Sequence, residues 1–257
     1  TLGRFIQTDK PDRADMPARP DLSVLLADYK GDASLSEGEV FDTAPANIVK
    51  RSERYALANG LKVVLLPKKT RGATVQLALR IGYGDEKSRA GKSAVDALAN
   101  ATLMRGADGL SRQQIYDKLD ALRTSGGIGL SGGAMQTKKA YLNDAISLIA
   151  QVYRTATFPS EELELVRKEM ITAIEESAKD PERVAFNALE RHSSPYPKGD
   201  PRYIATVAER VADLRAVTRE QVVNYARQMR GLSAGTLAIV GDFDAASVKP
   251  VLATSFG

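Results

Sequence analysis

The sequence predicts an α+β fold in which helices pack on one face of a mainly antiparallel sheet. Three observations lead to this prediction: a hairpin signal at Asn59-Gly60, strand-like runs near both ends of residues 51–257, and long stretches of helical periodicity between them. The elements follow the order strands, helices, strands, helices, strand, which is typical of an α+β layer. With 257 residues, 43% of them hydrophobic and 26% charged, the chain can bury a sizeable core.

Residues 1–50 are expected to form an extended interdomain linker or strap, and residues 51–257 a compact domain. Prolines interrupt the periodicity of the first segment, in which only Leu22 to Tyr29 has the pattern of a short helix. These prolines are Pro11, Pro17, Pro20 and Pro45. Because the chain begins without Met and stops directly after a helical stretch, we expect it to be a piece of a longer protein.

The first half of the compact domain is predicted to contain three strands followed by two helices. Strands over 54–58 and 61–67 flank Asn59-Gly60, a dipeptide typical of tight hairpins. A third strand is expected over 74–81, where apolar and polar residues alternate. Helical spacing then indicates a helix over 92–104 and a second helix that Ser111 caps.

The second half is predicted to contain another hairpin, a series of helices and a final strand. Strand-like runs over 124–130 and 133–139 surround Ser131-Gly132. Helices are expected over 141–155, 160–179, 181–190, 204–214 and 219–229, with a proline-rich loop over 192–201. Residues 235–240 form the last predicted strand.

The composition argues against several classes of function. Lys and Arg are scattered, the net charge is only +4 and Trp is absent, so no nucleic-acid surface is expected. The absence of Cys rules out disulfides and thiolate metal sites. Apolar runs such as 63–66 are too short to cross a bilayer. A single His and the lack of a G-x-S-x-G motif make a serine hydrolase an unfavourable hypothesis.

Three segments, by their order and spacing, resemble the zinc peptidases of the pitrilysin, insulinase and mitochondrial processing peptidase family. Residues 59–67 (NGLKVVLLP) resemble the opening strand of that family. Residues 81–86 (IGYGDE) resemble its next strand and a Gly-rich acidic turn, and residues 102–106 (TLMRG) the segment after its metal-binding helix. The resemblance covers about residues 50–257 and implies the α/β roll of these peptidases.

The inverted zinc motif of the family, H-x-x-E-H, is missing from the corresponding helix. In that motif two His, four residues apart on one helical face, hold zinc, and the Glu polarises a bound water. Counted back from Arg105-Gly106, the matching positions are Ala97, Asn100 and Ala101. A methyl group binds no metal, and an amide cannot take a proton from water near neutral pH. No catalytic residue, no metal site and no cofactor are therefore expected in this chain.

The resemblance also implies a third zinc ligand, a Glu on a later helix with an acidic residue two turns before it. Glu176 and Glu169 match this pair, and Glu175 is the less favoured match for the ligand. Because one carboxylate builds no zinc site, Glu176 is expected to be a vestige of that site or a surface acid. A weak metal site at Glu176 or at His192, the sole His, is the less favoured alternative.

By resemblance, the chain would be the inactive third of four domains in a clam-like peptidase whose other half binds zinc. Its implied function is to wall the peptide chamber and to assist substrate binding and closure, without peptidase activity of its own. The implied partners are the active half, in the same chain or as a separate subunit, and an unfolded peptide. A bacterial periplasm is the expected location, and the cytoplasm is the alternative.

Two other functions stay open at this point. The first is a non-enzymatic assembly subunit that pairs with a separate active peptidase or belongs to a structural complex. The second is an active enzyme with an unrelated site around Glu169 and Glu176, which would require a deep pocket with perturbed acids.

Overall fold

The computed structural model describes residues 37–200 and 202–257. Most of the predicted linker, including the helix expected over Leu22 to Tyr29, lies outside the described residues. The expectation that no other part of residues 1–50 is helical was wrong, because helix α2 spans Pro45–Arg51. Pro45 occupies the first turn of this helix, where its fixed φ fits and its missing N–H is not needed.

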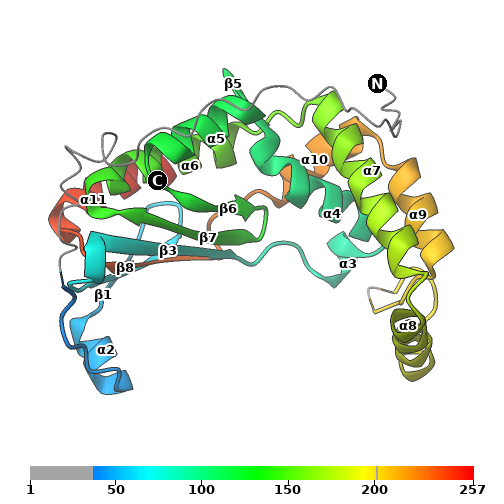
Figure 1. The fold of residues 1–257 in the computed structure, drawn as a ribbon, viewed down its shortest axis with the longest axis horizontal. Coiled ribbons are helices and arrows are strands. Elements are labelled where there is room, and N and C mark those ends of the chain that lie inside the picture. Colours follow the sequence, from blue (N-terminus) through cyan, green and yellow to red (C-terminus); the bar gives the residue numbers. More distant parts are fainter. Residues whose placement is uncertain (1–36, 201) are drawn as a thin grey trace, which may run out of the picture. The chain divides into compact units, whose positions relative to one another are not determined.

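The central sheet, as described, has six strands in the order β1-β2-β8-β3-β7-β6 (Figure 1). The strands are β1 (Glu53–Ala56), β2 (Lys62–Pro67), β3 (Thr74–Ile81), β6 (Ser125–Gly129), β7 (Gly132–Lys138) and β8 (Gly235–Gly241). Every neighbouring pair of this sheet is antiparallel except β2–β8, which is parallel. Both predicted hairpins and the mainly antiparallel sheet are thus confirmed.

The last strand of the sheet, β8, lies between two strands from the beginning of the domain. Leu237 pairs with Val63 of β2 on one side and with Leu79 of β3 on the other. Alternate residues of β8 are buried, which matches the period of two for a strand whose apolar side chains enter a core on one face. The sheet is therefore joined in its middle by the strand that comes last in the sequence.

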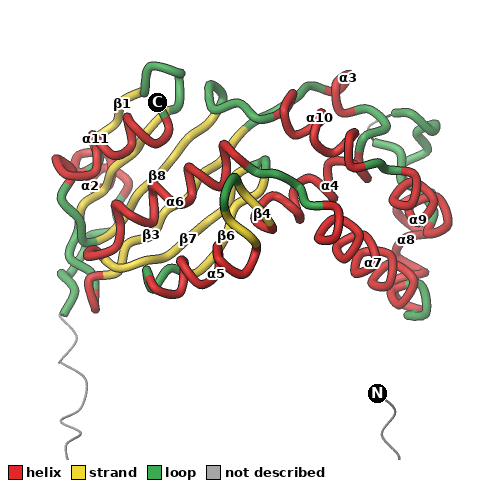
Figure 2. Tube along the Cα trace, turned by 90° about the horizontal axis from the view of Figure 1, so that it is seen from above, coloured by secondary structure: helices red, strands yellow, loops and turns green. Residues whose placement is uncertain are grey.

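Helices α5 (Arg112–Ala121), α6 (Leu142–Thr155) and α11 (Ala245–Phe256) lie over one face of this sheet (Figure 2). Eight residues of α6 are buried, including Ile146 and Ile149, and they meet the apolar side chains of the strands in one core. Burying a side chain of this size contributes about 1.5–3 kcal/mol. The predicted arrangement, a helical layer on one sheet face, is confirmed for these three helices.

A second group of helices packs at one end of the sheet. It contains α3 (Glu86–Arg89), α4 (Ser93–Thr102), α7 (Ser160–Ser177), α8 (Pro181–Ser193), α9 (Val207–Ala216) and α10 (Arg219–Met229). Helix α4 packs against α7, α9 and α10. The buried guanidinium of Arg167 donates hydrogen bonds to the carbonyls of Leu214 and Val217, which fixes α7 to the end of α9.

Several short elements complete the described part of the chain. The 3₁₀ turns are η1 (Arg71–Ala73), η2 (Leu103–Arg105) and η3 (Lys139–Tyr141), and β4 (Gly106–Ala107) pairs with β5 (Leu110–Ser111). The predicted cap at Ser111 is confirmed as a capping box with Gln114. Among the described helices, none is both long and apolar enough to cross a membrane.

Candidate functional site

Helix α4 carries the three positions at which the sequence predicts a lost metal motif. Its buried residues, such as Leu98 and Thr102, face the core. Ala97 is half-buried and Ala101 is exposed, so neither is part of the closely packed side. Helix α4 packs against α7, so the two sequence segments of the expected motif lie on neighbouring helices.

The side chain of Asn100 uses both ends of its amide in hydrogen bonds. Its Oδ1 accepts from the backbone N–H of Leu130, at 2.8 Å, and more distantly from that of Ser131, at 3.4 Å. Its Nδ2 donates to the carbonyl and the carboxylate of Asp96 at 2.9 and 3.1 Å, and to the hydroxyl of Tyr83 at 3.2 Å. Asn100 therefore joins α4 to the turn between β6 and β7.

Asp96, one helical turn before Asn100, is the centre of this polar cluster. The hydroxyls of Tyr83 and Tyr225 donate to the same oxygen, Asp96 Oδ1, at 2.5 and 3.0 Å. Burial, first, and the adjacent Asp96 carboxylate raise the pKa of both tyrosines. The hydroxyls therefore stay protonated hydrogen-bond donors to Asp96 at neutral pH and above.

The polar cluster borders an open surface depression beside Ala97. The lining includes Tyr83, Arg89, Asp96, Ala97 and Asn100. The guanidinium of Arg89 lies 5.4 Å from the centre of the Tyr83 ring, within the range of a cation–π contact. Sequence reasoning missed the roles of Tyr83, Asp96 and Tyr225, although the four-residue spacing of Asp96 and Asn100 on a predicted helix was a usable signal.

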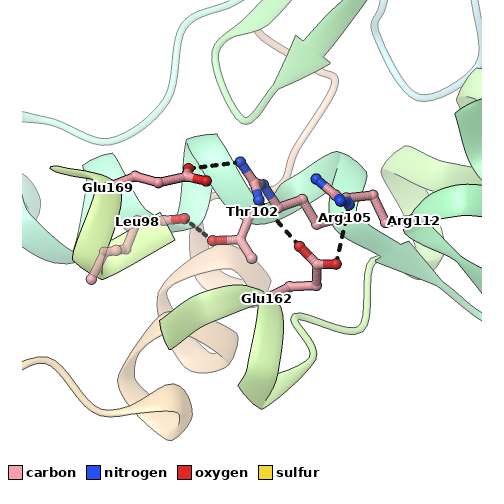
Figure 3. Close-up of polar contacts among 6 residues, drawn as sticks. All are labelled: Leu98, Thr102, Arg105, Arg112, Glu162 and Glu169. Atoms are coloured by element: carbon pink, nitrogen blue, oxygen red, sulfur yellow. Dashed lines mark hydrogen bonds and ion pairs between the residues drawn. The ribbon is translucent and has the colours of Figure 1, made fainter. Parts of the chain in front are cut away.

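The predicted acid Glu169 on α7 is bound in a chain of ion pairs (Figure 3). Arg105, at the end of η2, contacts Glu169 at 3.0 Å and Glu162 at 3.2 Å. Arg112 contacts the other oxygen of Glu162 at 3.2 Å. Because the Arg105 side chain is only 18% exposed, its charge is held between the two carboxylates and links η2 to α7.

Glu176 lies two turns further along α7 and belongs to a different ion pair. Its side chain is 62% exposed and contacts Lys179 at 2.7 Å. The neighbouring Glu175 contacts Arg215 at 3.6 Å. The seven-residue spacing therefore leads to two separate cations, and the structure does not bring Glu169 and Glu176 to a common partner.

His192 lies in the last turn of α8, so the prediction that it belongs to a loop was wrong. The predicted end of this helix near residue 190 was three residues short, because the helix continues to the residue before Ser194. Pro195 excludes helical geometry from the residue that precedes it, and this sets the observed end. His192 is exposed at that end.

The donor groups around α4 do not fit a zinc ion. Ala97 and Ala101 offer no donor atom, and the amide of Asn100 is committed to the backbone of the β6–β7 turn. Across residues 37–200 and 202–257, no three side chains of His, Cys, Asp or Glu are grouped so that they could hold a metal ion.

Comparison with solved structures defines the class of this fold. No family model and no curated protein matches the sequence. Among solved structures, the peptidase M16 inactive domain from Pseudomonas fluorescens superposes with a TM-score of 0.62 and 19% identity, covering 79% of this chain and 50% of that one. The fold is thus that of M16 peptidase structures, which confirms at the level of fold the resemblance carried by residues 59–67, 81–86 and 102–106.

Two further structures have the same fold. A protease from Helicobacter pylori gives a TM-score of 0.65 at 15% identity, over 80% of this chain and 49% of that one. The periplasmic protease PqqL from Escherichia coli gives 0.61 at 16% identity, over 80% of this chain and 24% of that one. The chain therefore spans half the length of these structures, or less.

Proposed function

We propose that this chain is a non-catalytic domain of a two-half zinc peptidase of the M16 type. The observation that carries the proposal is that the Asn100 side chain is engaged in hydrogen bonds within the domain. The resemblance puts the general base of the zinc motif at this position, and the side chain here is an amide whose donor and acceptor both hold the domain together. The alanines at 97 and 101 supply no metal ligand, which supports a structural rather than a catalytic role for the domain.

The proposed role is to form one wall of a chamber that closes around an unfolded peptide. Strand β6 supports this role, because in the described sheet it is an edge strand that pairs only with β7, and of its outward N–H groups that of Ile128 is occupied, by the Sδ of Met104. Three of its five residues are glycine, so few side chains obstruct an extended peptide that would add to this edge. Zinc and the catalytic residues would then belong to the partner half, in the same chain or in a separate subunit.

The PqqL structure is described as a periplasmic protease, and its fold supports a periplasmic location for this chain. Fractionation of the source cell tests this part of the proposal. Recovery of the parent protein with periplasmic markers is the expected result, and recovery with cytoplasmic markers would contradict it.

The proposed function is tested with a quenched fluorescent peptide and with metal analysis of the purified chain. Alone, the chain is expected to give no cleavage and less than one tenth of an equivalent of zinc after dialysis. Mixed with the H-x-x-E-H half from the parent gene or a neighbouring gene, it is expected to raise the cleavage rate. Chelator-sensitive cleavage by the chain alone would refute the proposal, and a partner half that is unaffected by it would favour the assembly-subunit alternative.

A further inference from the structure

Helix α8 has a continuous apolar face that the described domain leaves uncovered. None of its thirteen residues is buried. Val184, Phe186 and Leu189 have exposed fractions of 49%, 59% and 59%. Ala185 and Ala188 lie between them on the helical surface at about 100° per residue, so the five side chains form one apolar strip.

Helix α8 faces the rest of the domain with its polar side and with the two margins of its apolar strip. Asn187 is the one residue of α8 that is partly shielded. It lines a groove with Val207 and Arg210 of α9, and Val184 and Phe186 line the same groove, whereas Leu189 does not. An amphipathic helix ordinarily turns its apolar strip to the core, so this orientation indicates that something outside the described domain contacts the strip.

The size of the strip decides what kind of occupant it fits. A helix of thirteen residues is about 20 Å long and about 10 Å wide, which gives a face of roughly 200 Å². A stable contact between two folded proteins buries about 800 Å² on each partner. The face of α8 by itself is therefore too small for a stable contact with a second copy or with a rigid domain. An extended segment of about six residues has the matching length, at roughly 3.3 Å per residue.

The charge of α8 favours an uncharged occupant. The helix carries Glu182 and Glu190 against Arg183 and Arg191, which sum to zero. Arg183 is also paired with Asp180, at 3.8 Å, at the start of the helix. A strip with no net charge at its border offers no attraction to an acidic or a basic peptide, whereas apolar side chains of an unfolded segment would be removed from water on it.

We propose that the strip formed by Val184, Phe186 and Leu189 binds an extended, apolar and uncharged segment of a polypeptide substrate. This inference rests on the proposed function, because it assigns a contact within the same peptide chamber. It places that contact on α8, on a different element from the open edge of β6. The two surfaces can therefore be tested separately.

The test is binding of a fluorescein-labelled eight-residue peptide, with Leu and Phe alternating with Ser, measured by anisotropy on the 257-residue chain. The double substitution Phe186→Gln and Leu189→Gln is expected to weaken binding at least tenfold. Gln is a good helix former and the replaced side chains are exposed, so the fold is kept, as circular dichroism and the melting temperature verify. The matched control is Val49→Gln on α2, where the side chain is 57% exposed.

Each outcome supports or overturns the inference. The inference is supported if the α8 variant weakens peptide binding and the Val49→Gln control does not. It is also supported if the unmodified chain binds this peptide tenfold more tightly than a peptide in which Gln replaces Leu and Phe. Unchanged binding by the α8 variant overturns it and leaves the proposed function standing. Failure of the unmodified chain to bind the peptide overturns the inference and leaves the proposed function to the cleavage assay. Dimerisation that the α8 variant abolishes in sedimentation velocity also overturns the inference, because a second copy is then the occupant.

Discussion

Replacing Asn100 with Ala tests whether this side chain stabilises the domain by linking α4 to the β6–β7 turn. The substitution leaves the N–H of the fully buried Leu130 without its acceptor at 2.8 Å. An unsatisfied buried N–H costs about 1–3 kcal/mol, and the lost bond to Asp96 adds about 1 kcal/mol. Since Ala recovers some helix propensity, we expect a net loss of about 2–3 kcal/mol in the free energy of unfolding.

The assay for this prediction is urea unfolding followed by circular dichroism, with thermal melting as a second measure. A loss of this size lowers the melting temperature by roughly 4–12 °C for a domain of this length. Asn224→Ala is the matched control, because Asn224 is exposed on α10. That change is expected to be neutral or slightly stabilising. Equal stability of the two variants would refute the assignment of Asn100 as a structural link.

Three further predictions concern the surroundings of this link. Gly129→Ala would place a Cβ 2.6 Å from Asn100 Oδ1, so we expect a loss of about 2 kcal/mol in the free energy of unfolding. This loss should shrink by at least ~1 kcal/mol when Asn100 is already Ala, and additive losses in a double-mutant cycle would contradict the prediction. Arg105→Ala removes the cation shared by the half-buried Glu162 and the exposed Glu169 and should cost about 1–2 kcal/mol, whereas Lys179→Ala, at an exposed pair, should leave the free energy of unfolding nearly unchanged; urea unfolding compares the two. The backbone N–H of Thr206 and the hydroxyls of Tyr203 and Thr206 lower the pKa of Glu209 from 4.5 to about 2, so Glu209 stabilises the fold above about pH 4.5 and loses this effect as the pH falls toward 2. Glu209→Gln should therefore melt below the unmodified chain at pH 7, with a difference that narrows between pH 4.5 and 2; a difference independent of pH would speak against the carboxylate.

Much of the fold is encoded in short-range patterns. Asn59-Gly60 fixed the first hairpin, and residues 219–229 were predicted with the bounds that α10 has, because apolar spacing and a capping residue specify such elements locally. The insertion of β8 between β2 and β3 had no such signal. Strand order is a property of pairing between distant segments, and the apolar run of residues 235–240 would suit several places in a sheet.

The candidate site was predictable in its residue types and less so in its contacts. Counting from Arg105 led to Ala97, Asn100 and Ala101, which lie together on the outer part of α4. The backbone N–H groups that donate to Asn100 Oδ1 come from a turn about thirty residues away, and no local pattern predicts this contact. Similarly, the spacing of Glu169 and Glu176 predicts a common helix, but the cation that each one binds depends on which element packs beside α7.

The parallel pairing of β2 with β8 has a consequence for biosynthesis. Before residues 235–241 leave the ribosome, the hairpin of β1 and β2 has no strand to join it to β3, β7 and β6. The nascent chain therefore holds two incomplete sheets with open edges, and contacts across more than 150 residues must form late and slowly. During that interval the unpaired edges of β2 and β3 can pair with other chains, which is the main route to misassembly for this strand order.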